Sequence, residues 1–149
     1  MNKFLRRNIP NIFLLIAYGI FIYFILVNDY LAYEEVLRSH HVEILTINTI
    51  FIGFLYTTLG VMVGFLGNNK VSNMDRAGYM DEYYYTIYVG LLFFIGSATF
   101  GIIAVFFKDF TTNIYIYLFE QIFLFGGLIF FIKALYNLIY VIKKVRNNL

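Results

Sequence analysis

Four polar side chains stand inside the last apolar segment of this 149-residue chain. They are Glu120, Gln121, Lys133 and Asn137, and the segment that holds them covers residues 113–142. A charged side chain at the centre of a bilayer costs about 3 kcal/mol on insertion scales, so it usually faces a protein interior or water. We predict that these four residues mark a polar path. If they face inward in an oligomer, Glu120 forms a ring of charge at the outer mouth of a pore and Lys133 forms one near the inner mouth. The alternative is that both charged side chains extend to the headgroups.

No residue set with the spacing of a known catalytic or metal site accompanies these side chains. The chain has no HExxH motif, no phosphate-binding Gly-Lys loop and no cysteine, which excludes a thiol nucleophile and a thiolate metal site. His40, His41 and Glu43 lie close in sequence, but a structural zinc site needs about four ligands. We therefore interpret them as part of a solvated loop. We expect a protein that is not an enzyme, with no cofactor, no metal and no nucleic-acid partner.

Small residues recur at helical spacing in the second and third apolar segments. In the second segment the glycines fall at i, i+7, i+11 and i+14, which places them along one face of a helix. The third segment repeats that spacing with Gly90, Ser97, Gly101 and Ala104. Small faces let helix backbones approach closely in a bilayer, so we predict helix packing there, either as a tight hairpin within the chain or between chains. The glycines of the second segment are Gly53, Gly60, Gly64 and Gly67.

The composition is that of a chain that lies almost entirely in a membrane. Hydrophobic residues make up 61% and charged residues 13%, whereas about a quarter of the residues in a soluble domain are charged. Four apolar blocks are long enough to cross a bilayer as helices. We predict a single all-α integral membrane domain over residues 1–149, with transmembrane helices over about 11–30, 44–67, 83–107 and 113–142.

The distribution of positive charge predicts the orientation of the chain. Both ends are basic, and cytoplasmic segments carry an excess of Lys and Arg, so we expect both termini in the cytoplasm. The segment 68–82 is then also cytoplasmic. It is either a plain connector with room for a short interfacial helix or a contact site for a soluble partner. The terminal cations are Lys3, Arg6, Arg7, Lys143, Lys144 and Arg146, and the candidate partner residues of the loop are Lys70, Arg76, Gly78 and Tyr79.

Three short stretches carry a resemblance to a known family. They are Gly64-Phe65-Leu66-Gly67, Arg76-Ala77-Gly78-Tyr79-Met80 and Leu135-Tyr136-Asn137-Leu138. With the four-span pattern, they resemble the membrane subunit of the Rex phage-exclusion pair (RexB), mainly over residues 60–85. The loop between Gly67 and Gly78 is less basic than that family leads one to expect.

The resemblance implies an ion channel in the inner (cytoplasmic) membrane of a bacterium. A cytoplasmic sensor protein would open it during phage infection, and depolarisation would then halt the cell. On this basis we expect a homo-oligomeric pore in the lipid bilayer that acts in anti-phage defence by abortive infection. Two alternatives stay open: a small ion-coupled transporter, and a non-conducting interaction or immunity protein.

Overall fold

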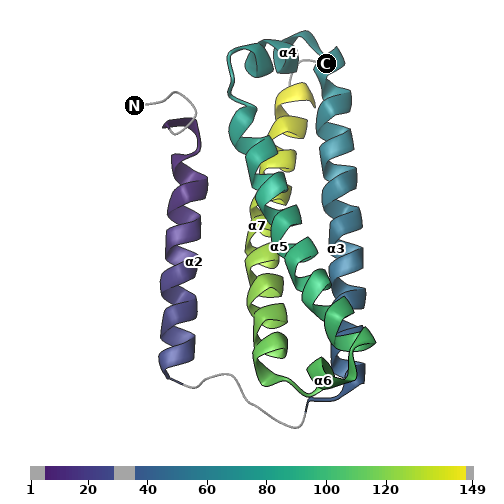
Figure 1. Ribbon diagram of the computed structural model, residues 1–149. Helices are drawn as coiled ribbons and strands as arrows, with labels where there is room; N and C mark the ends of the chain where they lie inside the picture. Colours follow the sequence, from purple (N-terminus) through teal and green to yellow (C-terminus); the bar gives the residue numbers. More distant parts are fainter. Residues whose placement is uncertain (1–5, 29–35, 147–149) are drawn as a thin grey trace.

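The structure is a computed structural model, and it describes residues 6–28 and 36–146. Every element in these residues is a helix (Figure 1). Four of the described helices (α2, α3 extended by η1, α5 and α7) are long and apolar enough to cross a membrane. The prediction of an all-α chain with four potential spans is therefore confirmed. The elements are α2 (Ile9–Val27), α3 (Arg38–Gly64), the 3-10 helix η1 (Phe65–Gly67), α4 (Asn69–Arg76), α5 (Asp81–Phe106), α6 (Lys108–Thr111) and α7 (Ile114–Arg146).

The helices α3, α5 and α7 form the core of the molecule, with α4 across one end and α6 at the other (Figure 1). We call these the α4 end and the α6 end. Each core helix buries a stripe that repeats every seven residues, which is the spacing of side chains that interlock between nearly antiparallel helices. The repeats are His41, Asn48, Leu55 and Met62 on α3; Ile87, Phe94 and Gly101 on α5; and Glu120, Gly127, Ala134 and Val141 on α7.

Helix α3 begins six residues before the predicted start of the second span. Arg38 opens the helix, and the backbone N–H of Leu37 donates to His40 Nδ1 at 3.3 Å. This contact satisfies a backbone group at the helix start, much as a capping side chain does. The segment that we had interpreted as loop up to Glu43 is thus helical from Arg38 onward. Its earlier acidic residues, Asp29, Glu34 and Glu35, lie outside the described residues, as do Lys3 and the end of the predicted first span.

Helix α2 lies beside the three core helices (Figure 1) and contacts them mainly through α5. Pro10 occupies its first turn, where the missing N–H costs nothing. Only Asn11 and Tyr18 of this helix are buried, while its apolar side chains are mostly exposed. In a bilayer this pattern is favourable, because lipid solvates the apolar face and protein satisfies the polar groups.

The short helix α4 fills the segment in which the sequence left room for an interfacial helix. Its Val71 is buried against Met80 and Val141. The helix ends with N–H groups of Gly78 and Tyr79 bonded back to the carbonyls of Asp75 and Met74, a pattern that requires a left-handed residue. Gly78 is that left-handed residue, with a φ angle of 75°.

The two small faces do not meet as the hairpin prediction required. Gly90, Ser97 and Gly101 of α5 are buried against side chains of α3 and α7. Gly53, Gly60 and Gly64 of α3 and Gly67 of η1 are exposed instead, and a Cβ added to any of them would meet nothing within 4 Å. The reason is that a close-packed interior must be filled by large side chains, so α3 turns Leu55 and Met62 inward. We call the exposed face, Gly53, Gly60, Gly64 and Gly67, the glycine lane.

Candidate functional site

A buried polar cluster lies at the α6 end of the core. It consists of His41 and Asn48 from α3, Ser97 from α5 and Glu120 from α7, and we call it the histidine cluster. All four residues have an exposed fraction of 0%. Burying a polar group without a partner costs several kcal/mol in an apolar medium, so the bonds within this cluster decide whether the three helices can pack here.

Hydrogen bonds join all three core helices through the histidine cluster. His41 Nδ1 lies 2.7 Å from Glu120 Oε1, and His41 Nε2 lies 2.9 Å from the carbonyl oxygen of Thr111. Asn48 Nδ2 donates to Ser97 Oγ at 2.8 Å, and Ser97 Oγ donates to the backbone carbonyl of Glu120, also at 2.8 Å. Two buried oxygens, Glu120 Oε2 and Asn48 Oδ1, have no hydrogen-bond partner among the residues described.

The small face of α5 makes the space for these polar side chains. A Cβ added to Gly101 would lie 3.7 Å from both Glu120 Cδ and Oε1, and 3.8 Å from the carbonyl oxygen of His41. A side chain larger than alanine would therefore press on the carboxyl group. Gly101, one of the small residues predicted to pack helix against helix, thus leaves room for the carboxyl group of Glu120.

A second polar cluster lies at the α4 end. Asn11 Oδ1 accepts from Lys133 Nζ at 2.6 Å and from Thr86 Oγ1 at 2.8 Å, while Asn11 Nδ2 donates to the carbonyl of Glu82 at 3.0 Å. Lys133 Nζ also pairs with Glu82 Oε1 at 3.0 Å. Asn137 Nδ2 reaches Thr86 Oγ1 at 3.4 Å. We call these five residues the lysine cluster; it binds α2 to α5 and α7.

Arg7 fastens the start of α2 to the turn after α4. Its guanidinium donates to Asp81 Oδ2 and to the carbonyl oxygen of Ala77, each at 2.7 Å. A Cβ added to Gly78 would fall 1.8 Å from Arg7 Nη1. Gly78 is thus required twice, for its positive φ and for the space that the guanidinium occupies. Farther along α2, the hydroxyl of Tyr18 donates to the carbonyl of Ile122.

An aromatic and aliphatic layer separates the two clusters. The ring of Phe51 stacks on Phe94 with centroids 5.3 Å apart and meets Phe131 edge-on at 4.8 Å. Leu55 and Ile87 complete the layer and are fully buried. The interior of one chain is thus filled between the histidine cluster and the lysine cluster.

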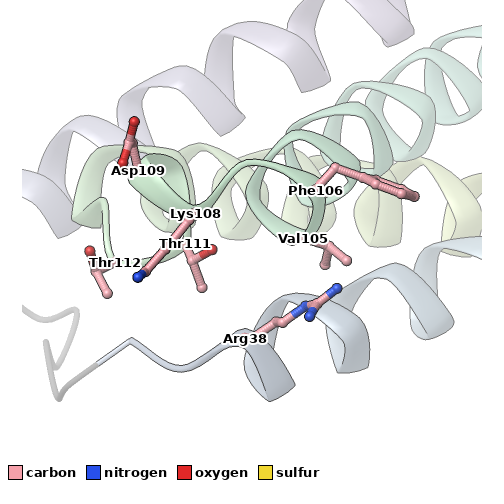
Figure 2. A pocket seen from close by; sticks show the side chains of 7 residues that line it. All are labelled: Arg38, Val105, Phe106, Lys108, Asp109, Thr111 and Thr112. Carbon is pink, nitrogen blue, oxygen red and sulfur yellow. The ribbon is translucent and has the colours of Figure 1, made fainter.

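A cleft opens beside the histidine cluster at the α6 end. Its volume is about 810 Å³, and Arg38 of α3 faces Lys108, Thr111 and Thr112 of the α6 turn across it (Figure 2). Thr111 belongs to both sites, because its carbonyl oxygen contacts His41 and its side chain lines the cleft. The cleft therefore reaches the residue that bonds the buried imidazole.

The predicted polar residues occupy different places in the fold. Glu120 belongs to the histidine cluster, Lys133 and Asn137 belong to the lysine cluster, and half-buried Gln121 belongs to neither. Both charged side chains bond to another helix: Glu120 is fully buried, and the Lys133 side chain, 19% exposed, pairs with Glu82. A ring of Glu120 side chains between chains would therefore require α7 to turn away from α3. Of the predicted loop residues, Lys70, Arg76 and Tyr79 are exposed and Gly78 is buried under Arg7.

Sequence reasoning did not identify His41, Asn11, Thr86 or Glu82 as site residues. A signal for His41 was present, because it precedes Asn48 by seven residues and Leu55 by fourteen, so a longer helix places all three on one stripe. Asn11 is a second such signal, because a polar amide in an apolar, lipid-facing helix usually has a partner in another helix.

No protein-family model matches the chain, and neither a curated protein nor a solved structure shows significant similarity to it.

Proposed function

We propose that this protein assembles into a homo-oligomeric pore that depolarises the cytoplasmic membrane. The observation that carries the proposal is the glycine lane on α3, which lies exposed along a potential membrane span and has no neighbour within the described chain. Lipid does not favour such a face over an apolar one, whereas a second helix gains close backbone contact from it. The lane supports association between chains through α3.

The conducting path in this proposal runs between chains. The interior of one chain is filled by the layer around Phe51, Phe94 and Leu55. Beside the glycine lane, α3 exposes the hydroxyl-bearing residues Thr46, Thr49 and Thr57, which give the shared surface some polarity. The setting in phage defence, and a cytoplasmic sensor that contacts Lys70, Arg76 and Tyr79, rest on the resemblance to the Rex membrane subunit.

Ion flux from liposomes tests the pore proposal. We expect the purified chain to pass ions under an imposed membrane potential, and Gly60→Ile to abolish the flux by keeping the α3 helices apart. Gly19→Ile is the matched control, because Gly19 on α2 is also exposed with nothing within 4 Å of its added Cβ. No flux from the wild-type chain under any trigger, or equal flux from all three chains, contradicts the proposal.

One observation favours the ion-coupled carrier as a second candidate function. Glu120 is buried inside a single chain and paired with His41, so a protonatable group is available at the level of the monomer. A carrier of this kind requires Glu120 but not the glycine lane, and its transport saturates with substrate. Flux that survives Gly60→Ile and is lost in Glu120→Gln would favour it. If both variants keep full biological activity, the interaction or immunity protein is the remaining candidate.

A further inference from the structure

The bonds of His41 fix how many protons its ring can carry. The carbonyl oxygen of Thr111, 2.9 Å from Nε2, can only accept a hydrogen bond. Nε2 therefore carries a hydrogen. The other ring nitrogen, Nδ1, faces Glu120 Oε1 at 2.7 Å, a distance at which one of the two atoms must donate.

A second hydrogen must therefore lie between Nδ1 and Oε1. If Glu120 is ionised, His41 carries both ring protons as an imidazolium; if Glu120 is protonated, its hydroxyl donates to the bare Nδ1. Both arrangements contain the same number of protons and have no net charge. The remaining arrangement, a carboxylate beside a neutral imidazole, would place two bare acceptors against each other.

We propose that His41 and Glu120 form a proton-binding site whose discharge loosens the α6 end of the bundle. Loss of the shared proton leaves one net negative charge with both partners fully buried, a state that an apolar interior penalises strongly. Glu120 Oε2 already has no partner among the described residues. The charge is relieved if α7 moves away from α3 and water enters.

Both members of the pair are fully buried, and its neighbours come from three helices. Helix α5 presents the uncharged Ser97 and Gly101 to it. From α7, the ring of Tyr117 meets His41 edge-on at 5.6 Å, and His40 of α3 also lies near Tyr117, at 6.1 Å. Of the other charged groups at this end, Arg38 of α3 with Lys108 and Asp109 of α6 line the cleft (Figure 2), and Glu43 of α3 is exposed. The cleft also includes Thr111, whose carbonyl oxygen contacts the imidazole.

Magnetic resonance on the full chain in lipid nanodiscs tests the proton count. Histidine labelled with ¹⁵N reports the ring protons of His41, and glutamate labelled at Cδ with ¹³C reports the ionisation of Glu120; His40→Gln and Glu120→Gln assign the signals. At neutral pH we expect either an imidazolium with a carboxylate or a neutral imidazole with a carboxylic acid. A carboxylate at Glu120 together with a singly protonated His41 ring would overturn the proposal.

Thiol labelling tests the loosening, since the chain contains no cysteine. Ala104→Cys places one thiol at a fully buried position of α5, close to Thr111, whose hydroxyl bonds the Ala104 carbonyl. Raising the pH should increase the rate at which a water-soluble maleimide labels this thiol. The increase should be about tenfold larger than in the same chain with Glu120→Gln. A tenfold difference corresponds to about 1.4 kcal/mol in the free energy of opening. The Glu120→Gln chain controls for the pH dependence of the thiol itself.

A second variant, His41→Gln, leaves the fully buried carboxyl group of Glu120 as the proton-binding group of the pair, so labelling should still rise with pH but over a different pH range from that of the Ala104→Cys chain. Equal labelling ratios across pH in the Ala104→Cys chain and in both variants would overturn the loosening. These measurements need no ion flux, so their outcome is independent of the pore proposal.

Discussion

At the scale of single residues, most of the buried polar side chains are bonded to another helix. Asn11 on α2 bonds α5 and α7, Ser97 on α5 bonds α3 and α7, and Glu120 on α7 bonds α3. Apolar side chains gain little by leaving lipid, so such bonds between helices can determine which partner a helix chooses. The buried polar residues thus specify the arrangement of the helices.

Removal of Asn11 tests this role of the lysine cluster. We expect Asn11→Leu to destabilise the folded chain by about 1–3 kcal/mol, because Lys133 keeps only its pair with Glu82 and α2 loses its bonds to Thr86 and to the carbonyl of Glu82. Asn28→Leu is the control, since the Asn28 amide, just after α2, donates to the carbonyl of Phe24 in that helix and to no other helix among the described residues. Unfolding in detergent by rising SDS concentration measures both.

A double-mutant cycle separates the bond between Asn11 and Lys133 from the rest of the cluster. The combination of Asn11→Leu with Lys133→Met should show a coupling energy of about 0.5–3 kcal/mol, as neighbours in one network do. Strictly additive effects would contradict a direct interaction between the two side chains.

Sequence reasoning reached only half of each polar cluster. An apolar helix that contains Glu120, Lys133 and Asn137 is recognisable from one segment alone. Their partners, His41 and Asn11, come from other helices, and the register between helices cannot be read from one chain. His41 was also assigned to a loop, because charged residues around it masked the first turns of α3.

At the scale of helices, the packing of α5 against α7 depends on glycines that admit aromatic rings. A Cβ on Gly127 would lie 2.7 Å from the ring of Phe94, and one on Gly126 would lie 2.7 Å from the ring of Phe93. Phe94 is fully buried and stacked on Phe51, so its ring has little freedom to move. The glycines of α7 were not singled out in the sequence, whereas those of α3 were.

Gly127→Ala should therefore destabilise the bundle by about 1–3 kcal/mol, the usual cost of overpacking a well-filled interior. Gly60→Ala on α3 adds the same methyl group where nothing lies within 4 Å, and it should leave the fold of the single chain unaffected. Thermal unfolding of both variants in detergent gives the comparison. If Gly127→Ala is as stable as Gly60→Ala, the tight contact with Phe94 is not present.

The number and approximate positions of the long helices could be predicted from hydropathy, because bilayer thickness sets their length, but α3 begins six residues earlier than predicted. The faces that they bury could not. In a bilayer both an apolar and a small face can lie outside, so the spacing of Gly53 and Gly60 indicated a special face without showing which neighbour it meets.

At the scale of the whole molecule, the described ends of the chain, in α2 and α7, lie at the α4 end (Figure 1). The basic residues Arg6, Arg7, Lys143, Lys144 and Arg146 gather there, while the α6 turn carries Lys108 and Asp109. An excess of Lys and Arg favours the cytoplasmic side, so we predict that the α4 end faces the cytoplasm.

Single cysteines can check this orientation, because the chain has no cysteine of its own. Asp109→Cys at the α6 turn should react with a membrane-impermeant thiol reagent added outside intact cells, and Lys70→Cys on α4 should react only after the cells are opened. Both residues are exposed in the structure, so burial does not confuse the readout. The reverse labelling pattern would show that the orientation is opposite to the predicted one, with the loop 68–82 outside the cell.

The central claim is that chains associate through the glycine lane and then depolarise the membrane. The most direct test is the membrane potential of cells that express the chain, followed with a voltage-sensitive dye during phage infection. The account predicts depolarisation with the wild-type chain and with Gly19→Ile, and none with Gly60→Ile at equal membrane abundance. A potential that stays unchanged with the wild-type chain, or that falls equally with Gly60→Ile, would contradict it.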